Sequence, residues 1–152
     1  MKKDTVLTIV KEIRDLLKSG AIIKAPEKPV CSKDGRFTKY ADGSVLDNLL
    51  HLIWYPTLPT KMNWEDAKKE CAKTGCRLPT RVELESLLDL TKHEPAIDKE
   101  IFPETKFDDY YWTATEVAGC SGSAWFVFFR YGYVSSYYKD SSNYVRPCRS
   151  SQ

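Results

Sequence analysis

Apolar residues recur at helical spacing close to the start of the chain, with charged residues between them. The positions that share one face are Val6, Ile9, Val10, Ile13, Leu16 and Leu17. This periodicity predicts an amphipathic helix, which Asp4 or Thr5 can cap and Gly20 ends. A single apolar stripe suits packing on the chain's own domain as well as association with a second copy. A homo-oligomer formed through this helix is therefore one of two open interpretations.

Strand patterns follow the helix. Two prolines within residues 25–32 indicate an extended connector. Residues 36–47 alternate around the turn pair Asp42-Gly43, which is typical of a β-hairpin. The apolar run over residues 49–55 then predicts a buried strand.

Two short helices are predicted in the middle of the chain from their start signals. Asn63 is a good N-cap residue for a helix that runs to about Thr74. Thr80 is followed three residues later by Glu83, and this pairing is the signature of a capping box. Both helices carry apolar side chains on one face, so they are expected to pack against a sheet.

The last third of the sequence has strand character. The predicted strands cover residues 110–115, 124–129, 133–137 and 143–149, and residues 116–123 and 139–142 are predicted loops. Helices in the first two thirds followed by antiparallel strands give an α+β fold. We expect residues 1–35 to form a helix and connector, and residues 36–152 to form one globular domain. The side chains expected in its core include Trp54, Trp64, Trp112 and Trp125.

Composition narrows the class of protein. A chain of 152 residues with 42% hydrophobic and 29% charged residues fits one globular domain. The net charge of +2 gives no basic field, so no nucleic-acid partner is expected. Apolar runs are too short for a membrane span. The apolar stretch over residues 6–10 is interrupted at once by charges, unlike a secretory signal, so the chain as given is expected to be cytoplasmic unless another route exports it.

Cysteine and histidine offer little for metal chemistry. The chain has five cysteines, an odd number, which favours reduced thiols but leaves one or two disulfides open. Cys71 and Cys76 have four residues between them, not the two of a zinc knuckle. Neither His51 nor His93 lies near a cysteine cluster. No metal site and no cofactor are expected.

An ordered series of motifs resembles the Lcl C-terminal domain family. The motifs are Asp42-Gly43-Ser44-Val45-Leu46-Asp47-Asn48, Asn63-Trp64-Glu65-Asp66-Ala67, Arg77-Leu78-Pro79-Thr80, Ala96-Ile97-Asp98, Tyr111-Trp112-Thr113-Ala114-Thr115, Ala124-Trp125, Gly132-Tyr133-Val134 and Tyr144-Val145-Arg146-Pro147-Cys148-Arg149. The resemblance covers roughly residues 36–149. It implies a fold similar to C-type lectins and to formylglycine-generating enzymes.

That resemblance suggests three functions. They are the variable protein of a diversity-generating retroelement, a glycan-binding adhesin domain and an oxidase of the formylglycine-generating type. The oxidase is expected to use a short cysteine pair near its C-terminus, which the spacing of Cys120 and Cys148 does not match. The calcium-site tripeptides of C-type lectins are absent as well, and Glu94-Pro95-Ala96 has alanine in place of an oxygen ligand. We therefore expect a non-catalytic domain that binds a protein or a glycan.

Side-chain alternation identifies candidate binding residues in the last third. Trp125, Val127 and Phe129 would share one face of a strand, and Phe126, Phe128 and Arg130 the other. A neighbouring segment rich in tyrosine and serine has the composition of antibody paratopes. We assign the first set to the core and expect the second on one exposed surface. The predicted binding residues are Val117, Cys120, Ser121, Ser123, Phe126, Phe128, Arg130, Tyr131, Tyr133, Ser135, Tyr137 and Tyr138.

Overall fold

A computed structural model describes residues 8, 10–12, 14–15, 18 and 27–152 of the chain. The described residues between 8 and 18 are helical, in line with the periodicity there. Of the predicted apolar stripe only Val10 is described, and its side chain is 45% exposed. Val6, Ile9, Ile13, Leu16 and Leu17 lie outside the described residues, and so does the proposed oligomerisation face.

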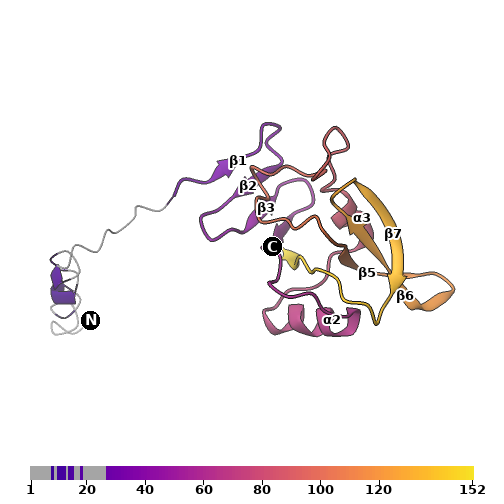
Figure 1. The fold of residues 1–152 in the computed structure, drawn as a ribbon. Coiled ribbons are helices and arrows are strands. Elements are labelled where there is room, and N and C mark those ends of the chain that lie inside the picture. The colour runs from indigo at the N-terminus through magenta and orange to yellow at the C-terminus, as the bar shows by residue number, and fades with distance from the viewer. Residues whose placement is uncertain (1–7, 9, 13, 16–17, 19–26) are drawn as a thin grey trace.

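Five short strands form one antiparallel sheet (Figure 1). They are β1 (Val30–Cys31), β2 (Phe37–Lys39), β3 (Val45–Asp47), β4 (Leu52–Trp54) and β8 (Cys148–Ser150), in the order β1-β2-β3-β4-β8. The predicted hairpin is confirmed as β2 and β3, and Gly43 provides the positive φ of 86° that its turn requires. Because β1 pairs with β2, this sheet begins before residue 36.

Three longer strands form a second antiparallel sheet in the order β5-β6-β7. They are β5 (Tyr111–Val117), β6 (Cys120–Phe128) and β7 (Tyr133–Tyr138). The loop predicted over residues 116–123 is wrong, because most of this segment extends the β5–β6 hairpin. The strand predicted over residues 143–149 is also too long, since only β8 at its end joins a sheet ladder.

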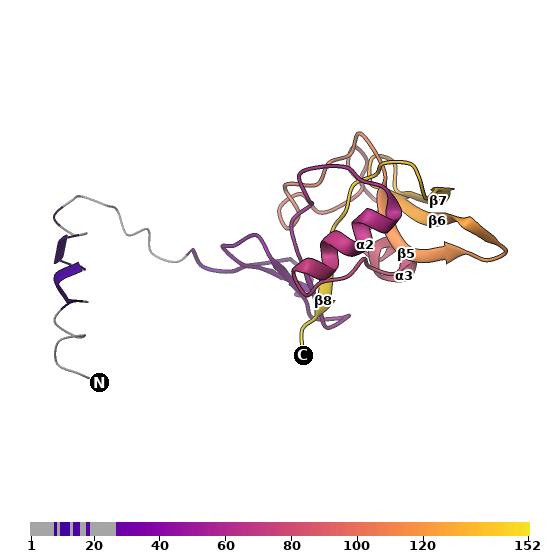
Figure 2. The same ribbon diagram turned by 90° about the horizontal axis from the view of Figure 1, so that it is seen from below.

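Both predicted helices are present, and their caps are as expected. Helix α2 (Trp64–Lys73) begins where the Asn63 side chain accepts a hydrogen bond from the Asp66 amide. Helix α3 (Arg81–Glu85) begins with a complete capping box between Thr80 and Glu83. In the view of Figure 2, the helices lie between the five-stranded sheet and the outer end of the three-stranded sheet. Antiparallel sheets with few short helices make this an α+β domain.

The core consists of two clusters of buried side chains. One contains Trp54, Tyr111, Val127 and Phe129, and the other contains Trp64, Trp112, Phe126 and Phe128. Successive residues of β6 therefore point into different clusters, since neighbouring side chains of a strand lie on opposite faces. No helix of the described residues is long and apolar enough to cross a membrane.

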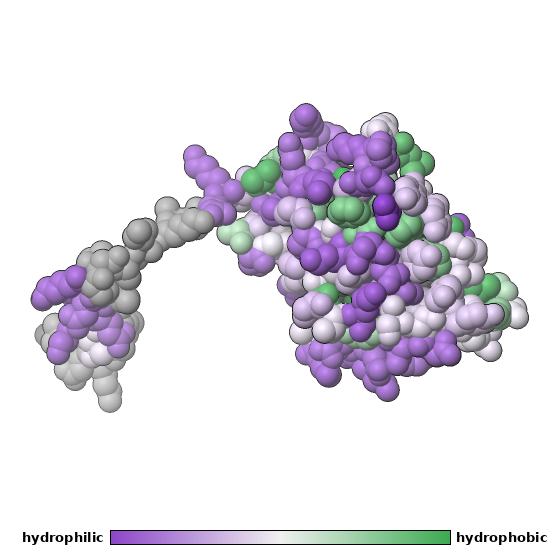
Figure 3. Space-filling view, viewed as in Figure 1, coloured by the Kyte–Doolittle hydropathy of each residue, from purple (hydrophilic) through white to green (hydrophobic). Residues whose placement is uncertain are grey.

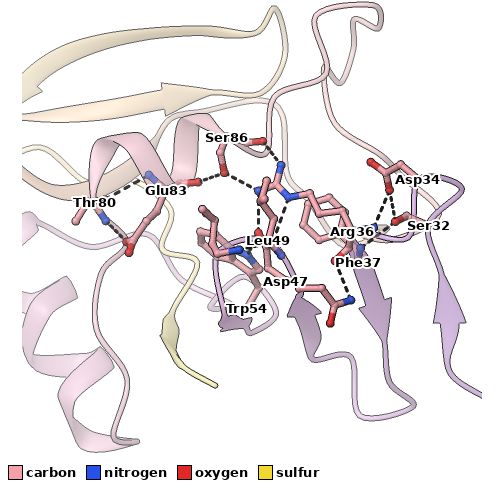
Figure 4. Close-up of polar contacts among 12 residues, drawn as sticks. Ser32, Asp34, Arg36, Phe37, Asp47, Leu49, Trp54, Thr80, Glu83 and Ser86 are labelled. Atoms are coloured by element: carbon pink, nitrogen blue, oxygen red, sulfur yellow. Dashed lines mark hydrogen bonds and ion pairs between the residues drawn. The ribbon is translucent and has the colours of Figure 1, made fainter. Parts of the chain in front are cut away.

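A buried ion pair between Arg36 and Asp47 lies where the five-stranded sheet meets the end of α3 (Figure 4). The Asp47 carboxylate is fully buried and accepts hydrogen bonds from Arg36 Nε at 3.1 Å and Nη2 at 2.8 Å. Trp54 Nε1 donates to the same carboxylate at 3.3 Å. Arg36 also donates from Nη1 to the Ser86 carbonyl at 2.8 Å, immediately after α3. The network holds the first sheet against the helix that packs on β5 and β6.

Candidate functional site

The register between β6 and β7 determines which aromatic side chains meet on the second sheet. Phe128 pairs with Tyr133, Phe126 with Ser135 and Ala124 with Tyr137. Directly opposed residues of antiparallel strands project from the same face. The two phenylalanines and the two β7 tyrosines therefore lie on one face of the sheet.

Tyrosine rings cover the phenylalanines on this face. Tyr110, immediately before β5, stacks on Phe126 with ring centroids 4.0 Å apart. Tyr133 contacts Phe128 edge-on at 5.3 Å, and Tyr131 contacts the same ring at 5.7 Å. Tyr137 lies 5.9 Å from Tyr110. We call Tyr110, Tyr131, Tyr133 and Tyr137 the tyrosine surface, and Phe126 and Phe128 its floor.

The surface and the floor differ in their contact with solvent. Tyr131, Tyr133 and Tyr137 are 56%, 42% and 44% exposed, whereas Phe126 and Phe128 are only 3% and 8% exposed. In Figure 3, strongly hydrophilic residues gather over α2 along the lower edge, while the side of the molecule formed by β6 and β7 is pale. Exposed aromatic rings on a firmly packed base form a surface of the kind that recognises ligands.

The predicted exposure of Phe126 and Phe128 is therefore wrong. Both faces of β6 are covered, because Trp64 and Trp112 pack beneath these rings and the tyrosines lie over them. Ser123 is also buried, at 7% exposure. The predicted core position of Trp125 is wrong in the opposite sense, since its ring is only half-buried and the Arg81 guanidinium lies 4.1 Å from the ring centroid.

The other predicted binding residues remain accessible to different degrees. Val117 and Arg130 are half-buried, and the exposed residues are Cys120, Ser121, Tyr131, Tyr133, Ser135, Tyr137 and Tyr138. Tyr138 also lies beside Tyr137, with ring centroids 6.1 Å apart. Tyr110 is not among the predicted binding residues. Tyr110 is in phase with Trp112, but the pairing of Trp112 with Phe126, which brings Tyr110 onto this face, is not visible in the local sequence pattern.

The basic residues at the two ends of β7 are paired. Arg130 Nε lies 3.1 Å from Glu94 Oε1, and Lys139 Nζ lies 2.8 Å from Glu116 Oε2. Partial burial and a hydrogen bond with Tyr110 raise the pKa of Tyr133 above its usual range. The hydroxyl of Tyr133 is therefore neutral at pH 7 and can both donate and accept hydrogen bonds. The tyrosine surface thus presents aromatic rings together with the neutral hydroxyl group of Tyr133.

A separate cleft of about 870 Å³ opens between residues 32–37 and residues 86–102. Its charged lining is mixed, with Lys33, Arg36 and Lys99 beside Asp34 and Asp98. Within the part of the chain that the structure describes, no group of three or more His, Cys, Asp or Glu side chains could hold a metal ion. The cleft therefore has no charge pattern that favours one ligand class, and the tyrosine surface is the stronger candidate site.

The chain was compared with models of protein families. The model described as the Lcl C-terminal domain matches residues 43–149, which include the strands from β3 to β7, the first two residues of β8 and both capped helices. The match also includes the whole tyrosine surface and its floor. A search of curated proteins finds no match to the chain.

Proposed function

We propose that the chain, which belongs to the Lcl C-terminal domain family, is a non-catalytic binding domain with a C-type lectin-like fold and a ligand site on the tyrosine surface. The observation that carries the proposal is that exposed tyrosines lie over buried phenylalanines on one face of β6 and β7. Tyr131, Tyr133 and Tyr137 are exposed, yet they contact each other or the buried phenylalanines beneath them.

Tyrosine is well suited to this role. Each ring supplies a large contact area while only two side-chain torsions must be fixed on binding. Contacts with Phe128 and Phe126 further restrict the rings of Tyr133 and Tyr137 before a ligand arrives. Ser135 lies between them on the same face and offers an adaptable hydroxyl group. The residue composition of the site and the restricted motion of its tyrosine rings therefore both favour recognition of a macromolecular surface.

The ligand that we favour is a protein, with the domain serving as the variable protein of a diversity-generating retroelement. Mutagenesis of adenines in asparagine-type codons yields tyrosine and serine among other residues, and these two are abundant at the exposed positions of residues 117–143. Sequencing this region in many isolates tests the idea directly. Variation concentrated at residues 131, 133, 135 and 137, with residues 126 and 128 constant, is the expected result.

A glycan is the second candidate ligand, because exposed aromatic rings also stack on sugar rings. The exposed ring of Tyr131 at the end of the tyrosine surface is suited to such a contact. A glycan array and a display library of proteins, probed with the same full chain, distinguish the two ligand classes.

Alanine substitution tests the site once a ligand has been found by either screen. Tyr133→Ala and Tyr137→Ala should each weaken binding about 30-fold, corresponding to roughly 2 kcal/mol for an aromatic residue at the centre of an interface. Tyr40→Ala is the matched control, since Tyr40 is 40% exposed but lies beside the β2–β3 turn. Unchanged affinity in both β7 variants, measured by calorimetry or surface plasmon resonance, would refute the proposed site.

A further inference from the structure

The edges of the two sheets differ in how well they are protected from pairing with another chain. In the five-stranded sheet, β1 has only two residues, and the outer edge of β8 is occupied because Cys148 and Arg77 exchange backbone hydrogen bonds of 3.0 and 2.9 Å. The outer edge of β5 is occupied by Tyr144, which accepts from the Trp112 amide at 3.0 Å, and by Pro79. Short or covered edges of this kind do not pair with other chains.

Strand β7 is the exception. It has six residues and, among the strands of the described residues, it pairs only with β6. Figure 1 shows it along the rim of the molecule. Over the residues that the structure describes, Tyr133 to Tyr137 make no backbone hydrogen bond to any partner other than β6.

The register identifies the backbone groups on this open edge. The Lys139 amide donates to the Gly122 carbonyl at 2.9 Å, so this N–H group is directed toward β6, while the Lys139 carbonyl accepts from the Trp64 amide at 3.0 Å. In an antiparallel ladder the direction alternates with each residue. Tyr133, Ser135 and Tyr137 therefore also direct their N–H and C=O groups toward β6. Val134 and Ser136 direct theirs outward, where both N–H and both C=O groups are available.

The side chains of β7 do not prevent pairing. Natural edge strands are commonly protected by a lysine, a proline, a bulge or an inward-pointing charge. The β7 sequence Tyr133-Val134-Ser135-Ser136-Tyr137-Tyr138 has no charged residue and no proline, and its register with β6 has no bulge. The flanking charges of Arg130 and Lys139 are neutralised within the chain by Glu94 and Glu116.

We propose that two copies of the chain pair antiparallel through their β7 edges, with the two-fold axis at Ser135, to form one continuous sheet. Val134 of each copy then exchanges both backbone hydrogen bonds with Ser136 of the other. This register uses every free group of those two residues.

Self-complementarity of the strand favours a second copy over an unrelated extended segment. In this register Tyr133 lies opposite Tyr137 of the second copy, and aromatic pairs across strands are favourable. The same antiparallel arrangement brings the end of the strand at Arg130 toward the end of the second copy at Lys139, and because both of these charges are already paired within their own chain, they do not repel each other across the dimer. The two tyrosine surfaces lie on the face of the extended sheet, not on the paired edge, and remain accessible side by side.

Charge substitution at the two-fold axis tests the proposal with the full-length chain. Ser135 is exposed and lies opposite itself in the dimer, so Ser135→Glu opposes two carboxylates and Ser135→Lys two ammonium groups. We expect the parent chain to be dimeric in sedimentation velocity, and each variant alone to dissociate with a Kd at least about tenfold higher, because like charges that face each other repel strongly. An equimolar mixture of the two variants should regain the dimer as a heterodimer.

A second pair of variants tests the edge without adding charge. Ser136→Pro removes an outward N–H group, which an edge strand tolerates in the monomer, and should abolish dimerisation, whereas Ser136→Ala should not. Circular dichroism checks that each variant is folded. A parent chain that is monomeric at every concentration overturns the proposal. A dimer that persists in Ser135→Glu, Ser135→Lys and folded Ser136→Pro also overturns it, and assigns dimerisation to another surface such as residues 1–26.

Discussion

Removing the charge of Asp47 should destabilise the domain strongly. The carboxylate is fully buried and lies 2.8 Å from Arg36 Nη2. It also accepts hydrogen bonds from the Leu49 amide at 3.0 Å, the Leu50 amide at 3.1 Å and Trp54 Nε1 at 3.3 Å. In Asp47→Asn, one acceptor oxygen becomes an NH₂ donor that faces these donors. The substitution therefore breaks hydrogen bonds and leaves the Arg36 charge without its partner.

The magnitude follows from the burial of the pair. Breaking a buried ion pair by neutralising one partner costs about 3–5 kcal/mol. Arg36 keeps its hydrogen bonds to the Ser86 carbonyl and hydroxyl, both at 2.8 Å, and 17% of its side chain is exposed, so we expect the lower half of that range. A loss of this size is a large fraction of the stability of a single domain.

Urea denaturation followed by tryptophan fluorescence measures this loss, because Trp54 donates a hydrogen bond to Asp47. Asp34→Asn is the control, since Asp34 is exposed and asparagine retains an acceptor oxygen for Ser32 and for the Arg36 amide. Its denaturation midpoint should stay close to that of the parent. If Asp47→Asn lowers the free energy of unfolding by less than about 1 kcal/mol, the ion pair does not contribute as we argue.

The same carboxylate predicts how stability depends on pH. Burial acts to raise the pKa of Asp47, but hydrogen bonds from Arg36, the Leu50 amide and Trp54 outweigh it and hold the pKa below its ordinary value. A group with a lowered folded-state pKa stabilises the fold above the unfolded pKa of about 3.9, and this contribution is lost as the pH falls through the folded pKa. The difference in unfolding free energy between the parent and Asp47→Asn should therefore be constant near neutral pH and shrink below about pH 4.

Further predictions concern the turn after β6 and the buried thiols. Gly132→Ala should destabilise the domain by roughly 1–3 kcal/mol in thermal denaturation, because φ is +77° and the new Cβ would lie 2.9 Å from Leu90 Cδ2. Gly122→Ala is the control and should have little effect, because its new Cβ meets no atom within 4 Å. Burial raises the pKa of Cys71 and Cys148 to about 12, so roughly one thiol in ten thousand is ionised at pH 8. Mass spectrometry after brief alkylation should find the exposed cysteines modified and these two protected until urea unfolds the chain; rapid alkylation of both in the native state would contradict their burial.

Local signals in the sequence were sufficient for the helices and the first hairpin. Asn63 and Thr80 cap through atoms of the next few residues, so their geometry follows from a few neighbouring positions. The turn at Asp42-Gly43 is local in the same way. The three features therefore could be predicted without knowledge of the rest of the fold.

The candidate site depended on contacts that a local pattern does not contain. Alternation along residues 124–129 assigns side chains to two faces, but it cannot say whether the second face meets solvent. That face is covered by Trp64 and Tyr110, which are distant in sequence from Phe126. The polar residues 120–123 likewise resemble a loop until their pairing with β5 and β7 is known. The tyrosines of β7 could be predicted as surface residues from the high tyrosine and serine content of the segment. This signal does not depend on which side chains pack beneath them.

The division between the tyrosine surface and its floor has a consequence for protein engineering. Phe126 and Phe128 pack the β6–β7 hairpin against the core, so substitution of either residue removes packing that the fold requires. Tyr131, Tyr133 and Tyr137 contact the floor from the solvent side, and substitution of these tyrosines leaves the floor itself unchanged. A combinatorial library with these three tyrosines and Ser135 randomised should consist largely of folded members that differ in affinity. The domain would then serve as a small binding scaffold in which specificity can be selected without repeated repair of stability.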